Sequence, residues 1–88
     1  MVKAEEARRL LQIGTRGHAM VMAVRDTGSA VGDNPVTELD LCVALAGQEP
    51  YRVLHRQAIA KVAAGSLWPG AKVPIRVDPS NPHNVLVA

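Results

Sequence analysis

The chain has no phenylalanine, one tryptophan, one tyrosine and one cysteine among its 88 residues. With so few aromatic side chains, a hydrophobic core has to be built from Val, Leu, Ile, Met and Ala. A domain of this length buries only about 60–65% of its unfolded surface, so its stability margin is narrow. A single cysteine excludes a disulfide within the chain and is typical of a reducing compartment. We therefore expect one small cytoplasmic domain.

Long apolar runs and a strong charge excess are also missing. No segment approaches the roughly 20 apolar residues of a membrane-spanning helix, and the charged first residues do not resemble a signal peptide. Ten basic and eight acidic side chains give a net charge of +2, and the two signs are interleaved along much of the chain. This balance does not favour a polyanion as the partner.

The first residues have the pattern of a short amphipathic helix. Four apolar side chains recur at helical spacing within 3–13, and Gly14 is a plausible end. We assign residues 1–14 to this helix and residues 15–88 to a single barrel domain. A helix of about eleven residues is marginal in water, so it needs a surface to pack on. That surface is its own barrel, a second copy of the chain, or the surface of a membrane.

The rest of the chain favours strands. Alternating apolar and polar residues predict strands at 18–25, 36–46, 51–56, 73–77 and 85–87, with a loop at 26–35 and one or two helical turns within 57–64. The predicted core consists of Leu39, Leu41, Val43, Val73, Ile75 and Val77. The fold class is therefore all-β: a small five-stranded OB/SH3-like barrel, with a short helix at its start and a helical turn between the third and fourth strands.

Two patterns resemble a catalytic or a metal-binding motif, but neither is complete. Asp26-Thr27-Gly28 matches the Asp-Thr/Ser-Gly signature of aspartic proteases, but Arg25 stands where that family has an apolar residue. The usual turn roles of Asp and Gly explain the motif equally well. His18, His55, His83 and Cys42 have the atoms of a zinc site but lack CxxC or HxxxH spacing. We expect no catalytic residue, no cofactor and no metal ion, and hence no enzyme.

A barrel of this size is also compatible with binding single-stranded nucleic acid, which uses aromatic platforms and a basic groove. The candidate strip consists of Tyr51, Arg52, Arg56 and Arg76. Glu38 and Asp40 lie on a strand expected beside it, and only two aromatic residues are present. This function is kept as the alternative, and a protease-like or metal-dependent hydrolase comes third.

The order of several short motifs resembles a known group of proteins. The motifs are the segment from Gly14 to Ala19, Asp33-Asn34-Pro35, Glu49-Pro50-Tyr51, Trp68-Pro69-Gly70, and Val73 to Pro79 followed by Asn81-Pro82. Together they resemble the small β-barrel domains of uncharacterised actinobacterial proteins, in which the domain often follows transmembrane helices. The resemblance implies the barrel fold but no activity and no catalytic residues. This chain differs from many members because it has no transmembrane helix.

Self-association is the partner hypothesis that the residues favour. The first strand is apolar on both faces, and the short helix has an apolar edge that has to be covered. The candidate interface residues are Leu10, Leu11, Val21 and Ala23. We therefore expect a non-enzymatic binding or self-assembly module, most simply a symmetric dimer, with an unknown protein as the other partner and peripheral membrane contact left open.

Overall fold

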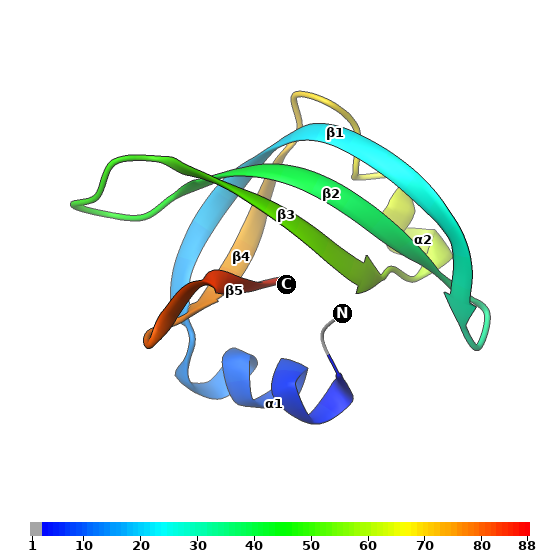
Figure 1. Ribbon diagram of the computed structural model, residues 1–88, viewed down its shortest axis with the longest axis horizontal. Helices are drawn as coiled ribbons and strands as arrows, with labels where there is room; N and C mark the ends of the chain where they lie inside the picture. The colour runs from blue at the N-terminus through cyan, green and yellow to red at the C-terminus, as the bar shows by residue number, and fades with distance from the viewer. Residues whose placement is uncertain (1–2) are drawn as a thin grey trace.

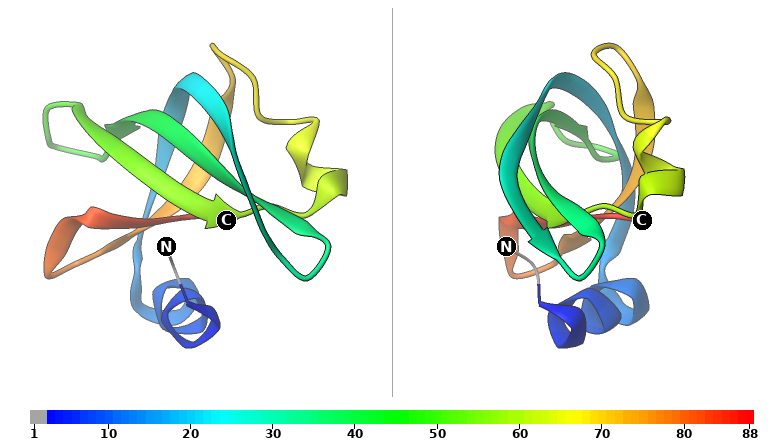
Figure 2. Two further views of the ribbon diagram at one scale, coloured as in Figure 1. Left: turned by 45° about the vertical axis from the view of Figure 1, so that its right-hand side comes forward. Right: turned by 90° about the vertical axis from the view of Figure 1, so that its right-hand side faces the viewer.

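The longest strand, β1, is the one around which the others assemble (Figure 1). The computed structural model describes residues 3–88, in which five antiparallel strands form one sheet in the order β3-β2-β1-β4-β5. The sheet curls into a nearly closed barrel, so the predicted fold class is confirmed (Figure 2). In chain order, the elements are α1 (Ala4–Ile13), β1 (Thr15–Val31), β2 (Asn34–Ala44), β3 (Tyr51–Ala58), α2 (Lys61–Ala64), β4 (Lys72–Asp78) and β5 (Asn81–Val87).

The core follows the alternation of the strands. All six side chains predicted for it are buried, and residues of β1, β3 and β5 complete it. Leu39, Leu41 and Val43 of β2 have no exposed surface, because their strand turns alternate residues toward the barrel interior. Val21 of β1 lies opposite Leu41 and is equally buried.

The segment predicted as a loop at 26–35 is mostly strand, and that prediction is wrong. β1 continues to Val31, and β2 begins at Asn34 after a two-residue turn in which Gly32 has φ +59°. The register of β1 against β2 shifts between Asp26 and Ala30, so the glycine and small polar residues serve an irregular hairpin. Thr27 Oγ1 holds the two strands together by donating a hydrogen bond to the Val36 carbonyl at 2.8 Å.

β3 and β5 lie at the two ends of the sheet, and side chains join them where the barrel closes. The Gln57 amide donates to the Val87 carbonyl at 3.1 Å and accepts from the Val87 N–H at 3.0 Å. The Tyr51 hydroxyl donates to the Pro82 carbonyl at 2.7 Å. Within residues 3–88, no backbone ladder connects these two strands. We call this junction the seam.

The helix α1 packs against its own barrel. Leu10 is fully buried, and Arg76 donates from Nη1 to the Leu11 carbonyl at 2.5 Å, so it satisfies one carbonyl at the end of the helix. Arg9 Nη2 lies 2.6 Å from Asp78 Oδ2 and also pairs with Glu6. In the described part of the chain, no helix is long and apolar enough to cross a membrane.

Candidate functional site

The outer surface of the sheet carries exposed apolar side chains where β1 meets β2. Met20 and Met22 are 49% and 41% exposed and line one groove of about 420 Å³ with Cys42, Ala44 and Pro50. We call these five residues the outer patch. Met22 lies on the same outward side as Met20 because alternate residues of a strand face the same way. The register of β1 against β2 shifts between Val21 and Ala23, so that Ala23, the next residue, lies opposite Asp40.

Cations flank the outer patch on both sides. The strand registers place Lys72, Met20, Cys42 and Arg52 in one row across four strands, with the apolar pair in the middle. Arg52 forms two hydrogen bonds with the carboxylate of Asp40, at 3.1 and 2.7 Å, and these bonds lower the pKa of Asp40. Lys72 forms no ion pair with another residue of the described chain.

A second charged row crosses the same surface toward the β1–β2 turn. Glu38 accepts hydrogen bonds from Arg25 at 3.0 Å and from Arg56 at 2.9 Å. The two guanidinium groups lower the pKa of Glu38, with Arg25 contributing most. Two cations share one carboxylate, so this row keeps a net positive charge.

The predicted interface residues do not form one surface. Leu10 and Val21 have no exposed surface, so neither is available for a partner and that part of the prediction is wrong. Val21 faces the core because alternate residues of a strand point to opposite sides. Leu11 is 46% exposed on α1, whereas Ala23 lies opposite Asp40 on the sheet. The apolar side chains that β1 turns outward are instead Met20 and Met22.

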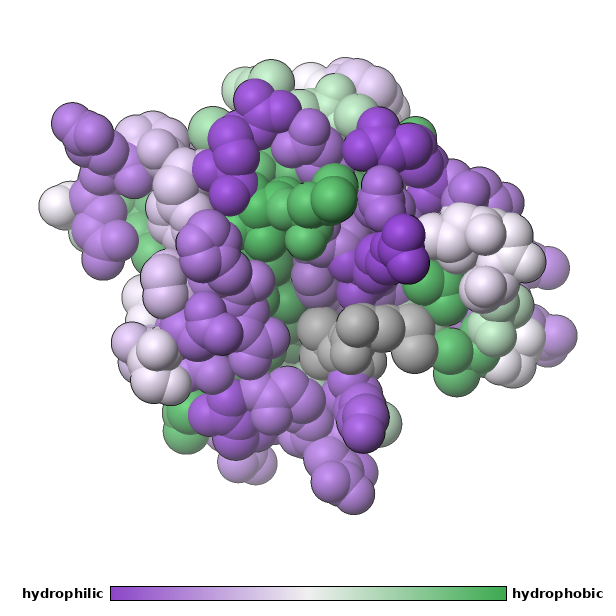
Figure 3. Space-filling model, in the orientation of Figure 1, coloured by the Kyte–Doolittle hydropathy of each residue, from purple (hydrophilic) through white to green (hydrophobic). Residues whose placement is uncertain are grey.

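The residues of the candidate nucleic-acid strip lie on different parts of the barrel, and most of them already bind other residues of the chain. Arg52 and Arg56 lie on the outer side of β3 and bind acids of β2, while half-buried Tyr51 bonds across the seam. Arg76 lies on β4 and contacts the end of α1. Figure 3 shows separate hydrophobic areas among hydrophilic residues on the face seen in Figure 1. Leu54, which is 64% exposed, lies between the two arginines of β3 in the sequence.

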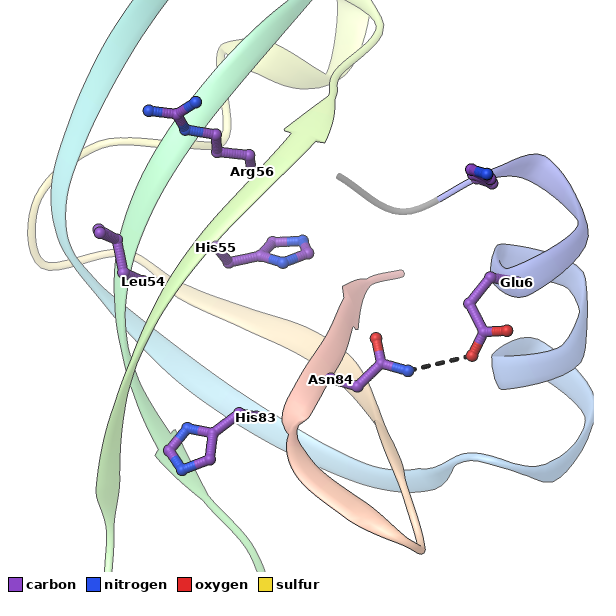
Figure 4. Close-up of a pocket in the computed structure, with 7 residues that line it drawn as sticks. Glu6, Leu54, His55, Arg56, His83 and Asn84 are labelled. Carbon is purple, nitrogen blue, oxygen red and sulfur yellow. Dashed lines mark hydrogen bonds between the residues drawn. The ribbon is translucent and has the colours of Figure 1, made fainter.

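The seam opens into a polar cleft of about 440 Å³ beside α1 (Figure 4). His55 points from β3 into this space, and Asn84 of β5 donates to Glu6 of α1 at 3.0 Å. Glu6 is also held by Arg9, whose hydrogen bond is the main reason that the pKa of Glu6 is lowered. Lys3 and Arg56 are the cations in the lining, and Arg56 is paired with Glu38.

The hydrogen bonds of the seam determine which ring nitrogen of His55 carries a hydrogen. The Val87 N–H can only donate, so its partner on Gln57 must be Oε1. Gln57 Oε1 can only accept, and it lies 2.8 Å from His55 Nε2, so this nitrogen carries a hydrogen. His55 is only 6% exposed, and its burial lowers its pKa.

The remaining chemical motifs have ordinary structural positions. Asp26 Oδ1 accepts a hydrogen bond from the Gly28 N–H at 2.9 Å, which is the usual role of an aspartate in a turn. His18, His55 and His83 lie on β1, β3 and β5. No group of three or more His, Cys, Asp or Glu residues in the described chain is placed to hold a metal ion. Sequence reasoning overlooked the outward methionines because both faces of β1 are apolar, although their spacing places them on one side.

The comparisons with known proteins supply no relative. No family model, no curated protein and no solved structure matches the chain. The resemblance to small barrel domains of actinobacterial proteins therefore stays a prediction from the motifs that suggested it.

Proposed function

We propose that the barrel is a non-enzymatic protein-binding module that works through the outer patch. The observation that carries this proposal is the exposure of Met20 and Met22 beside Cys42 in one groove. Contiguous apolar surface is costly on a small domain and usually marks an interaction site. Methionine side chains are flexible and polarizable, so they adapt to the shape of a partner.

The charges around the outer patch favour an acidic partner. Lys72 stands beside the apolar row without an ion pair in the described chain, and the row of Arg25, Glu38 and Arg56 has two cations for one carboxylate. A protein segment with apolar side chains flanked by Asp or Glu complements this arrangement. A second copy of the chain is the less favoured occupant, because a two-fold contact through this face brings like charges together.

The other candidate functions have weaker support. For nucleic-acid binding, Tyr51 is turned toward the seam and offers no exposed platform, and Arg52 and Arg76 are engaged by Asp40 and by the end of α1. For a protease, Asp26 is engaged in its own turn. We further infer a cytoplasmic location, since Cys42 is a free thiol and such thiols are typical of reducing compartments.

The test compares two charge-introducing variants. Met20→Glu with Met22→Glu places anions in the outer patch, whereas Val62→Glu places one at a side chain that is 93% exposed on α2. Cross-linking through Lys72 in a lysate of the source cells, followed by mass spectrometry, identifies what contacts the patch. We expect acidic partners with the wild type and with Val62→Glu, and their loss with the double variant.

Light scattering of the purified proteins separates the two kinds of partner. A monomer supports a heterologous acidic partner. A dimer that the double variant dissociates assigns the outer patch to self-association instead. An identical cross-linked set from the wild type and the double variant overturns the proposal.

A further inference from the structure

The groove of the outer patch brings together four side chains that carry soft or borderline metal ligands. His18, Met20, Met22 and Cys42 all line it and supply one imidazole, two thioethers and one thiol. Three of the four come from a single stretch of β1 in which every second residue is a potential donor. The fourth, the only cysteine of the chain, comes from β2.

The strand register explains how these donors meet. Met20 lies directly opposite Cys42, and His18 lies opposite Ala44, two residues further along β2. Directly opposed side chains have Cβ atoms about 4.5–5.5 Å apart, and diagonal neighbours are about 7–8 Å apart. Imidazole and thioether groups on flexible stems span such distances. Met22, two residues after Met20, brings the second thioether to the same outward side.

The donor set selects the kind of ion. Thiolate and thioether sulfurs prefer Cu(I), whereas Mg²⁺, Ca²⁺ and Mn²⁺ prefer oxygen ligands. None of the described residues that line the groove is a carboxylate, and the nearby Asp40 is occupied by Arg52. Cys42 is a free thiol. When Cu(I) binds, a Cu–S bond forms, the thiol proton passes to solvent, and the copper keeps its oxidation state.

We propose that His18, Met20, Met22 and Cys42 form a binding site for a single Cu(I) ion. The site shares three residues with the outer patch, but the two proposals can be tested separately, because replacing methionine by leucine removes the sulfur and keeps an apolar side chain of similar volume. The competing explanation is that both methionines serve only as apolar surface.

The test is an anaerobic titration of the full chain with Cu(I) against a competing Cu(I) chelator. Ag(I), a redox-stable substitute, is followed by NMR of the methionine methyl groups. We expect one equivalent of either ion, with shifts at Met20, Met22 and the His18 ring. Loss of even an outer-shell partner typically weakens a metal site about 10–100-fold, so Met20→Leu with Met22→Leu should weaken binding at least about tenfold. Cys42→Ser should abolish it.

One variant outside the groove serves as the control. His83→Gln changes a histidine on β5 outside the groove and should leave binding unchanged. All substituted positions in the groove are at least partly exposed, and thermal unfolding checks that each variant remains folded. If the double leucine variant binds the ion as tightly as the wild type, the thioethers do not hold it and the binding is due to the thiol alone, which overturns the proposal. Binding of half an equivalent, with a dimer bridged by Cys42, overturns it as well, as does no binding.

Discussion

Gln57 joins β3 to β5 through its side chain, whereas the other neighbouring strands are joined by backbone hydrogen bonds. Its amide satisfies both the N–H and the carbonyl of Val87. Gln57→Leu leaves both groups without this partner, and an unsatisfied buried polar group costs about 1–3 kcal/mol. We expect a loss of that size in the free energy of unfolding, measured by urea titration. Gln12→Leu, on the exposed side of α1, is the matched control, and equal losses in both variants would contradict this role for Gln57.

His55 makes the stability of the protein depend on pH. Burial lowers its pKa in the folded state, while the unfolded chain has the ordinary value near 6.5. As pH falls through 6.5, the unfolded state takes up protons first, so the folded state loses relative stability. Melting temperatures between pH 8 and pH 5.5 should therefore decline in the wild type. The decline should shrink in His55→Gln, and an equal decline in both proteins would exclude His55 as its source.

At the scale of elements, α1 is fastened to the barrel by one buried side chain and by polar contacts. Leu10 is fully buried and Leu11 is 46% exposed, so adjacent leucines provide a matched pair. Leu10→Ala should lower the free energy of unfolding by about 2–5 kcal/mol, the range for buried leucines. Leu11→Ala should change it by at most about 0.5 kcal/mol. Chemical denaturation measures both, and similar losses would mean that α1 is not packed on its own barrel.

A second prediction at the scale of elements concerns unfolding of the protein at low pH. Asp78 on β4 accepts hydrogen bonds from the backbone N–H and the hydroxyl of Ser80, and it pairs with Arg9. These partners, the Ser80 N–H first, hold the pKa of Asp78 far below its usual range. The stabilisation is complete above about pH 5 and is lost as the pH falls from there toward the folded pKa. Asp78→Asn should reduce the steepness of acid unfolding followed by circular dichroism, and an unchanged acid transition would contradict this.

The elements also show what the sequence could and could not predict. Regular alternation identified β2 and β4 and the faces that they bury, because one face of each strand is clearly apolar. In β1 both faces are apolar, so the pattern could not decide whether Val21 or Met22 points inward. The glycines and Asp26 that suggested a loop belong to an irregular hairpin. The outer patch depends on the register between β1 and β2, which a single-strand pattern does not contain.

At the scale of the whole molecule, the margin of stability is small. At about 0.05–0.15 kcal/mol per residue, a chain of this length has only about 4–13 kcal/mol in total. Leu41 lies at the centre of the core and is fully buried. Leu41→Ala should cost about 2–5 kcal/mol, a large share of that total. A thermal melt equal to that of the wild type would show that the core is not organised around β2.

The seam has a consequence for the order of events in folding. β3 and β5 are far apart in sequence and meet through side chains, so their junction contributes little stability until the rest of the sheet has formed. Closure should therefore follow the rate-limiting step. In chevron measurements, Gln57→Leu should accelerate unfolding and leave the refolding rate nearly unchanged. The persistence of the closed barrel, rather than the speed of its formation, would then be the property that Gln57 controls.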